Sequence, residues 1–325
     1  MKIAIPDDYQ DAVRTLECFQ KLNGHAVTSY NDHVSDPETL AARLQETEAL
    51  VLIRERTPIT ESLLARLPRL KLIVQTGRQA PHLDLAACTR HGVAVIYATP
   101  TTAGRPYATA ELTWGLILAA MRFIPQEVES MKAGHWQHTL GRTLHGRTLG
   151  IFGYGKIGSL VATYAKAFGM QVLVWGREGS RSRASADGFT VAADRDTLFR
   201  EADVLSLHLV LKDETRGIVT AKDLQKMKAS AVLVNTSRAA LIAPGALEEA
   251  LRSGHPGYAA VDVYENEPVT EHPLLHMDNV ICTPHLGYVE KDSYELLLGA
   301  AFDQLLAFAD GKTAAVANPE TLKQA

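Results

Sequence analysis

Short runs of apolar residues alternate with stretches of helical periodicity in the first third of the chain. The apolar runs have the length of buried strands, and the stretches between them place apolar residues on one face of a helix. Strands that alternate with helices predict a parallel sheet covered on both faces. The strands expected here span residues 2–5, 26–30, 49–53, 71–76 and 93–97, and the helices lie near 8–20, 37–45, 60–67 and 84–91.

The alternation resumes beyond residue 148, after a long apolar helix expected at 108–122 and an irregular stretch that reaches about residue 145. Two separate series of this kind predict two doubly wound α/β domains. The second series has expected strands at 148–152, 171–175, 202–208, 231–236, 258–264 and 280–283, with helices at 157–168, 221–227, 244–252 and 293–309.

A glycine-rich turn joins the first strand of this second series to its helix. Glycines with G-x-G-x-x-G spacing give a tight turn, close approach of the backbone to a pyrophosphate, and close helix–strand packing. The helix that begins here points its N-terminal amides at an anion. Glycine clusters alone mark turns, but the flanking strand and helix favour a nucleotide site. The residues assigned to it are Gly153, Tyr154, Gly155, Lys156, Ile157 and Gly158.

The residues after the next strand bear on which nicotinamide cofactor binds. In NAD-binding folds an acidic residue there accepts the ribose hydroxyls, but this chain has Gly176 and Arg177. Arg177, with Arg181 and Arg183 close behind, offers cationic donors suited to a 2′-phosphate. The alternatives are a solvated surface loop, or a ribose contact from Glu178. The expected cofactor is NAD(P), with NADP(H) favoured.

Composition limits the partners more than it identifies them. A chain of 325 residues fits two domains, and its net charge of −4 gives no general attraction to nucleic acid or anionic membranes. No apolar run reaches the ~18 residues of a membrane span, and the chain opens directly on a strand, so we expect no signal peptide. Three scattered cysteines form neither a metal motif nor a disulfide framework. We therefore expect a cytoplasmic protein with no metal site.

Three residues beyond the glycine turn have complementary chemistry. Arg238, Glu267 and His285 each follow an apolar strand, and so belong to the carboxyl edge of the sheet, where α/β folds bind ligands. Arginine can bind a carboxylate bidentately, histidine can exchange a proton near neutral pH, and a carboxylate beside the imidazole would orient it. Individually, each has a plain alternative as a salt-bridge, turn or core residue.

With these motifs in order, the chain resembles the D-isomer-specific 2-hydroxyacid dehydrogenase family, which includes phosphoglycerate dehydrogenases and glyoxylate/hydroxypyruvate reductases. The resemblance implies that Arg238 binds the substrate carboxylate and carbonyl, that His285 is the acid/base, and that Glu267 is its partner. The segments that carry the resemblance are 148–158, 235–238, 262–268 and 283–287, with Ala110-Glu111 at the start of the long helix.

The resemblance also implies roles around the nicotinamide. Asp262 would contact the carboxamide, or alternatively would only cap a turn. His208 would line the nicotinamide pocket or be structural, and Thr236 would help to shape that pocket.

The family's architecture implies a Rossmann nucleotide domain, here residues 99–284, inserted into a flavodoxin-like substrate domain made of residues 1–98 and 285–325. Sequence order alone does not reveal this insertion. The family also implies a homodimer formed through the helix at 108–122.

Substrate contacts are expected from two loops of the first domain. Arg54, Gly77 and Arg78 follow strands and resemble the family's substrate-binding loops, and Arg54, Arg56 and Arg78 could together attract an acidic substrate. As an alternative, each arginine is an ordinary surface residue. The chain departs from the family pattern at Gln79, Ala98 and Tyr288.

These observations favour a phosphoglycerate dehydrogenase-like enzyme that acts on a small 2-oxo or 2-hydroxy acid. A glyoxylate/hydroxypyruvate reductase is the alternative within the family. From a different class, a dinucleotide-sensing regulatory protein would use the same fold.

Overall fold

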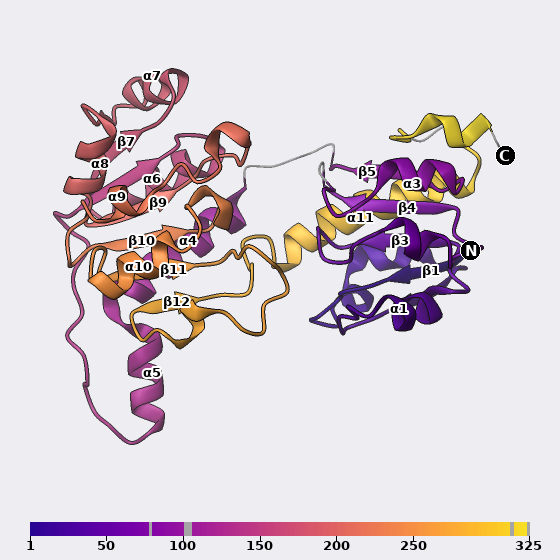
Figure 1. Ribbon diagram of the computed structural model, residues 1–325, viewed down its shortest axis with the longest axis horizontal. Coiled ribbons are helices and arrows are strands. Elements are labelled where there is room, and N and C mark those ends of the chain that lie inside the picture. The colour runs from indigo at the N-terminus through magenta and orange to yellow at the C-terminus, as the bar shows by residue number, and fades with distance from the viewer. Residues whose placement is uncertain (78–79, 101–105, 313–314, 324–325) are drawn as a thin grey trace. The chain divides into compact units, whose positions relative to one another are not determined.

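The computed structural model describes residues 1–77, 80–100, 106–312 and 315–323, and the chain forms two compact units (Figure 1). Unit 1 comprises Met1–Ala103 and Glu290–Ala325, and unit 2 comprises Gly104–Val289. The chain thus leaves unit 1, builds unit 2, and returns. In this division His285 belongs to unit 2.

Unit 1 is built on a five-stranded parallel sheet of order β2-β1-β3-β4-β5. The order reverses direction between β1 and β3, which makes the carboxyl ends of these two strands the switch point of the sheet. The strands are β1 (Lys2–Ile5), β2 (Ala26–Ser29), β3 (Ala49–Leu52), β4 (Leu72–Thr76) and β5 (Ala94–Ala98).

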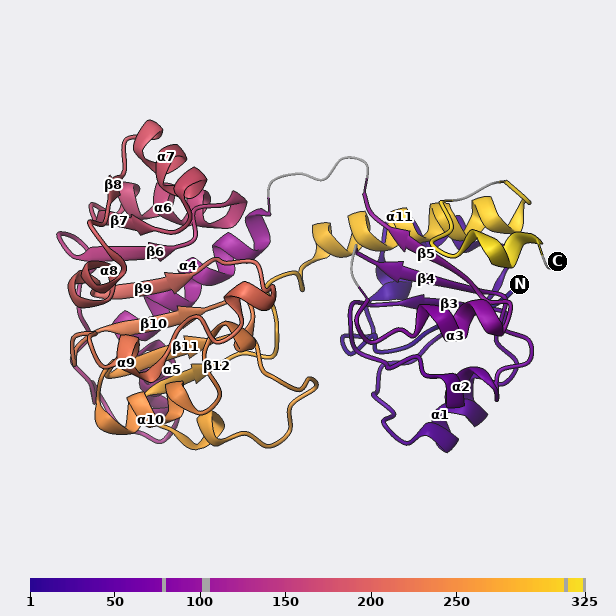
Figure 2. The same cartoon turned by 45° about the horizontal axis from the view of Figure 1, so that its top comes forward.

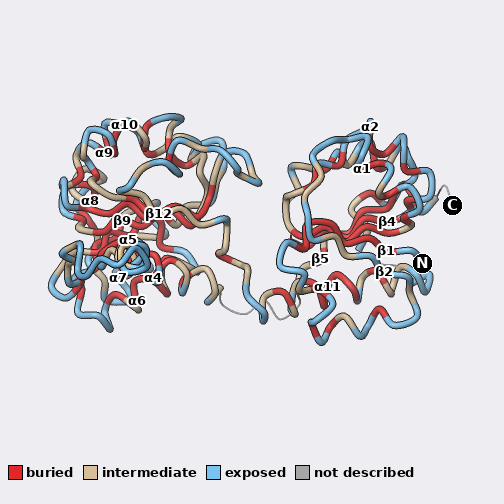
Figure 3. Tube along the Cα trace, turned by 90° about the horizontal axis from the view of Figure 1, so that it is seen from below, coloured by how far each residue is buried: buried red, intermediate tan, exposed pale blue. Residues whose placement is uncertain are grey.

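Helices cover both faces of this sheet, and β3 and β4 are buried along their whole length (Figure 3). The C-terminal helix α11 (Lys291–Ala309) lies on the face opposite α1 and α2, so the last part of the chain completes the fold begun by the first. The other helices are α1 (Pro37–Leu44), α2 (Glu61–Leu64) and α3 (Leu85–Arg90), with the 3-10 helices η1 (Val13–Thr15), η2 (Glu17–Leu22) and η6 (Pro319–Lys323).

Unit 2 contains a seven-stranded parallel sheet of order β12-β11-β10-β9-β6-β7-β8. Figure 2 labels the seven strands, and their order can be followed there. The order reverses between β6 and β9, the arrangement of doubly wound dinucleotide-binding folds. The strands are β6 (Thr148–Phe152), β7 (Gln171–Trp175), β8 (Thr190–Val191), β9 (Val204–Leu207), β10 (Val232–Asn235), β11 (Tyr258–Val261) and β12 (Val280–Cys282).

Two hydrophobic clusters, one on each face, hold the unit 2 sheet. One joins the sheet to α4 and α6, and the other joins it to α8, α9 and α10. Since both faces are covered, the central strands read as nearly continuous apolar runs. The helices are α4 (Tyr107–Arg122), α5 (Ile124–Lys132), α6 (Lys156–Ala167), α7 (Glu178–Ala186), α8 (Arg195–Glu201), α9 (Ala221–Leu224) and α10 (Ala246–Ser253), with the 3-10 helices η3 (Asp213–Thr215), η4 (Ala239–Leu241) and η5 (Pro273–His276).

The prediction of a helix at 8–20 is wrong in type. The segment forms two 3-10 helices separated by the extended residue Leu16. The buried Asp8 carboxylate accepts hydrogen bonds from the amides of Ala12 and Val13, and Glu295 of α11 accepts from the amides of Glu17 and Cys18. These side chains satisfy the backbone where a continuous helix would have used its own carbonyls.

The irregular stretch predicted after residue 122 is also wrong, because α5 occupies its first part. Phe123 has a left-handed backbone (φ 53°) that separates α5 from α4. No residue of α5 is buried, and its apolar residues Ile124, Val128 and Met131 are exposed. The helix therefore lacks the buried apolar face by which sequence periodicity identifies a helix. Among the helices that the structure describes, none has both the length and the apolar run needed to cross a bilayer.

Candidate active site

The glycine turn and His208 meet at the switch point of the unit 2 sheet. The turn follows β6 and His208 follows β9, and the His208 amide donates to the Phe152 carbonyl at 2.8 Å. Gly153 has φ +99°, and a Cβ there would lie 2.7 Å from the His208 carbonyl oxygen. A Cβ on Gly158 would collide with the Gly153 carbonyl. Both glycines are therefore required for the backbone to pass this closely between strand and helix.

The remaining residues of the predicted nucleotide loop start α6. Gly155 is its N-cap residue, and Lys156 and Ile157 form its first turn. A Cβ on Gly155 would meet nothing within 4 Å, which leaves space at the exposed helix N-terminus for an anion. Tyr154 instead points inward: its ring is buried and its hydroxyl donates to Asp187 at 2.7 Å. Tyr154 thus anchors the loop from behind.

Burial lowers the pKa of His208 to about 4, so its imidazole is neutral at physiological pH. Its Nε2 lies 2.9 Å from the Ser206 hydroxyl. The prediction left open whether this histidine is structural or faces the cofactor. The backbone of His208 contacts the glycine turn, so this residue has a structural role.

A cavity of about 390 Å³ lies beyond the carboxyl end of β7. Two further arginines belong to α7: the Arg181 guanidinium lies 4.8 Å from the centre of the Trp175 ring, and Arg183 donates to the Tyr154 carbonyl at 2.9 Å. Arg177, the N-cap residue of α7, lines the cavity. The wall includes Phe152, Trp175, Gly176, Arg177, Lys212 and Glu214.

The turn after β10 carries Thr236 and Arg238. Asn235 closes it, because its side chain accepts from the Ser237 amide and donates to the Arg238 carbonyl, each at 3.0 Å. Thr236 is buried and shares a 2.7 Å hydrogen bond with Thr113 of α4. The helix under the sheet therefore fixes the start of the turn.

His285 and Glu267 come together at the carboxyl edge of the sheet. His285 Nδ1 lies 2.6 Å from Glu267 Oε2, while Glu267 Oε1 accepts from the Tyr264 amide at 2.9 Å. Burial alone would raise the pKa of Glu267, but its hydrogen bond to His285 and the charges of His285 and Arg238 outweigh this, and the pKa is lowered. The Glu267 carboxylate is thus held ionised beside the imidazole. The positive charge of Arg238 also favours this ionised form.

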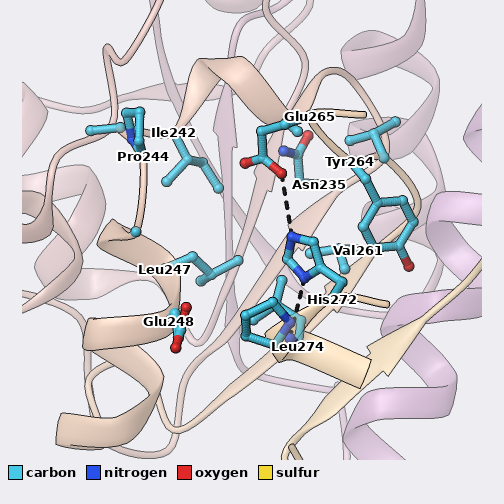
Figure 4. A pocket seen from close by; sticks show the side chains of 15 residues that line it. Asn235, Ile242, Pro244, Leu247, Glu248, Val261, Tyr264, Glu265, His272 and Leu274 are labelled. Carbon is cyan, nitrogen blue, oxygen red and sulfur yellow. Dashed lines mark hydrogen bonds and ion pairs between the residues drawn. The ribbon is translucent and has the colours of Figure 1, made fainter. Parts of the chain in front are cut away.

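The loop that carries Glu267 is braced at its far end by His272. Figure 4 shows His272 between Glu265 and Leu274, inside a pocket that borders Asn235. His272 Nε2 pairs with Glu265 at 3.3 Å, its Nδ1 accepts from the Leu274 amide at 3.2 Å, and its ring contacts Tyr264 edge-on. These contacts close the loop on both sides of Glu267.

Asp262 fixes the turn that carries His285. Its carboxylate is fully buried and accepts from the Thr283 hydroxyl at 2.6 Å, the Leu286 amide at 2.7 Å and the Gly287 amide at 2.9 Å. His285 itself has a left-handed backbone (φ 53°). Asp262 therefore binds residues before and after His285 and fixes its left-handed backbone. These are the contacts of a residue that caps a turn.

In unit 1 the structure brings Arg54 and Gly77 together. Arg54 follows β3 and has a left-handed backbone (φ 59°), and its amide donates to the Thr76 hydroxyl at 2.9 Å. Its guanidinium lies so close to Gly77 that a Cβ there would be 2.5 Å from Nη1. Arg78, and Gln79 after it, lie outside the described residues.

The sequence reasoning missed a buried polar cluster at the switch point of unit 1. Asp7, which is 2% exposed, accepts from Thr57 at 2.5 Å and contacts His33 at 2.8 Å. Its carbonyl accepts from Arg56 at 2.6 Å, and Arg56 lies 4.5 Å above the Tyr9 ring. Arg56 is therefore not a plain surface arginine. Two adjacent aspartates, one residue beyond the end of the first strand, were the available signal.

The described residues contain no group of three or more His, Cys, Asp or Glu side chains placed to hold a metal ion. The glycine turn, the α6 N-terminus and the cavity beyond β7 are instead suited to a dinucleotide, because they combine close backbone approach, free helix amides and a partly apolar wall.

Comparisons with known proteins agree with this geometry. A family model described as the NAD binding domain of D-isomer specific 2-hydroxyacid dehydrogenase matches residues 114–287, which run from within α4 to the turn after His285.

Individual relatives cover more of the chain. The glyoxylate reductase of Aeropyrum pernix is 39% identical over 85% of this chain and 84% of its own length. The D-3-phosphoglycerate dehydrogenase of Methanocaldococcus jannaschii is 38% identical over 77% of this chain but only 47% of its own length. The crystal structure of a phosphoglycerate oxidoreductase from Vibrio cholerae is 55% identical, covers 96% of this chain and 99% of its own, and superimposes with a TM-score of 0.90.

The lowered pKa of Glu267 predicts a pH-dependent contribution to stability. A carboxylate whose folded pKa lies below its unfolded value, about 4.3, stabilises the fold above that value and loses this effect as pH falls through the folded pKa. We expect the free energy of unfolding of wild type to exceed that of Glu267→Gln at pH 6, and this difference to shrink steadily toward pH 3. Urea unfolding at several pH values measures it.

Glu249→Gln, at an exposed position of α10, serves as the control and should show a much smaller trend. A difference between wild type and Glu267→Gln that is the same at pH 6 and pH 3 would contradict the assigned interaction.

Proposed function

The chain belongs to the D-isomer-specific 2-hydroxyacid dehydrogenase family, and on this premise we propose that Arg238, Glu267 and His285 perform its hydride-transfer reaction on a small 2-oxo or 2-hydroxy acid. The observation that carries the proposal is the 2.6 Å contact between His285 Nδ1 and Glu267 Oε2. A histidine oriented by an ionised carboxylate is the general acid that reduction of a carbonyl needs.

The contacts assign a task to each side chain. Glu267 occupies Nδ1 of His285, so Nε2 is the ring nitrogen that donates a proton to the substrate oxygen in reduction and accepts it in oxidation. Arg238 binds the substrate carboxylate and stabilises charge that develops on the oxygen. When bound, the nicotinamide supplies or accepts the hydride. We keep residues 1–98 and 285–325 as the substrate domain and residues 99–284 as the nucleotide domain of this proposal.

Toward the cofactor, we assign the glycine-turn residues together with Arg177, His208, Thr236 and Asp262. For the substrate we propose Arg54, whose guanidinium lies beside Gly77 and 3.5 Å from the Glu55 carboxylate, together with Gly77 and Arg78. The three arginines of these loops, Arg54, Arg56 and Arg78, favour a phosphoglycerate dehydrogenase-like enzyme over a glyoxylate/hydroxypyruvate reductase. The paired His285 and Glu267 favour an enzyme over a sensor that only binds dinucleotide.

Replacing His285 tests the reaction. We expect wild type to oxidise NADH or NADPH with a member of a panel made of glyoxylate, hydroxypyruvate and 3-phosphohydroxypyruvate. His285→Ala should lower kcat by about 10²–10⁴-fold because the proton donor is lost, while the dinucleotide Kd stays within about twofold. Steady-state kinetics and fluorescence titration measure the two quantities.

His276→Ala is the matched control, since this histidine is 72% exposed and its partner Glu271 is also at the surface. Tight dinucleotide binding by wild type without turnover on any member of the panel would support the sensor instead. A kcat of His285→Ala close to that of wild type would contradict the assignment of His285 as the proton donor.

We propose NADP(H) as the preferred cofactor, because no acid stands at the end of β7 and Arg177 and Lys212 both line the cavity there. Arg177→Ser should weaken NADPH binding by about tenfold, through loss of a charge-assisted hydrogen bond to the 2′-phosphate, and leave the NADH Kd nearly unchanged. Titrations of both cofactors measure this, with Arg200→Ser in α8 as control. A tenfold or greater preference of wild type for NADH in kcat/KM would overturn the proposal.

We also propose a homodimer. The resemblance implies the helix at 108–122 as its contact, but much of α4 packs in the core of unit 2, so we propose α5 and the segment after it as the contact surface. Ile124, Val128 and Met131 recur on one face of α5 and are 47%, 44% and 59% exposed, while Trp136 and Leu140 are 74% and 91% exposed. A patch of this kind marks an interaction site. Light scattering should give twice the mass of one chain, and Met131→Glu should shift the mass toward one chain at low concentration. Lys132→Glu is the control, and a monomeric wild type would contradict the proposal.

A further inference from the structure

Tyr288 lies beside the His285 imidazole, in the same turn. The two ring centroids are 5.6 Å apart and the ring planes meet at 75°. This separation and angle are typical of an edge-to-face aromatic contact. We propose that Tyr288 is a positioning residue, whose ring holds the His285 imidazole in the orientation that proton transfer requires. The inference rests on the proposed function of His285.

One hydrogen bond does not fix an imidazole. The contact between Nδ1 and Glu267 Oε2 holds one atom of the ring, but the ring can still tilt about that contact through coupled changes of χ1 and χ2, of which χ2 is a broad torsion for histidine. Tilting moves Nε2, the atom that must reach the substrate oxygen. A second contact on the flank of the ring removes this freedom, and Tyr288 supplies it.

Tyr288 can do this because its own backbone is held firmly. Asp262 accepts from the amides of Leu286 and Gly287, the Gly287 carbonyl accepts from Thr109 at 2.7 Å, and the Val289 amide donates to the Leu286 carbonyl at 2.9 Å. A Cβ on Gly287 would lie 3.3 Å from Thr109 and 3.4 Å from Asp262, so the turn is also packed tightly. The turn therefore presents the Tyr288 ring to His285 from a fixed position.

The aromatic ring, rather than the hydroxyl, is the part that contacts His285 in this arrangement. Tyr288→Leu removes the ring and keeps an apolar side chain, whereas Tyr288→Phe keeps the ring. These two variants separate positioning from the filling of space and from any role of the hydroxyl.

The kinetic test uses glyoxylate, which has no side chain that position 288 could obstruct. We expect Tyr288→Leu to lower kcat about tenfold with KM and the dinucleotide Kd changed less than about twofold, because misplacement of a catalytic group affects the reacting geometry more than binding. Tyr288→Phe should restore kcat to within about twofold of wild type. Urea unfolding of each variant shows whether it is folded.

A change in KM alone, or a kcat of Tyr288→Leu within twofold of wild type, would overturn the proposal. So would an equal loss in Tyr288→Phe, which would point to the hydroxyl. If wild type turns over no 2-oxo acid, the proposed function fails, and positioning is then decided by NMR of the full chain with ¹⁵N-labelled histidine. The His285 ring resonances should broaden in Tyr288→Leu and stay sharp in Tyr288→Phe, and unchanged spectra in both would overturn it.

Discussion

The buried carboxylate of Asp262 is the contact on which the candidate site depends. It lies at the end of β11 and accepts three hydrogen bonds from the turn after β12. A left-handed residue such as His285 costs about 1–2 kcal/mol, and the three hydrogen bonds to Asp262 fix the turn in this conformation. They hold the backbone on which both His285 and Tyr288 are placed.

The rest of the site is also formed where the ends of neighbouring strands lie side by side. The glycine turn and His208 meet because β6 and β9 are neighbours, and Glu267 reaches His285 because β11 and β12 are neighbours. α4 then ties two of these turns from below, through Thr113 to Thr236 and through Thr109 to Gly287. Each side chain in the site is thus placed by a rigid element, while the turns themselves stay short.

Much of this could be predicted from the sequence, because buried parallel strands are continuous apolar runs and glycine spacing limits the backbone. The expected strands were close to those observed, except that the two-residue strand β8 was not expected. The strands expected at 202–208, 231–236 and 258–264 were too long and included His208, Thr236 and Asp262. The pattern of apolar residues in the sequence does not show where the hydrogen bonds between neighbouring strands end. Helix α5 and the Asp7 cluster were missed for related reasons, since one buries no face and the other depends on contacts between distant segments.

The hydrogen bond from Thr109 to Gly287 has a consequence for how the two units share one chain. It joins a residue near the start of unit 2 to one near its end, so the folded unit returns the polypeptide close to the point where it departed. An unstructured insertion of the same length would add a large loop-closure entropy to unit 1, whereas a folded insertion with adjacent ends acts on unit 1 as a short loop. Because α4 packs against β10, β11 and β12, the fold of unit 2 itself limits the entropy that its insertion costs unit 1.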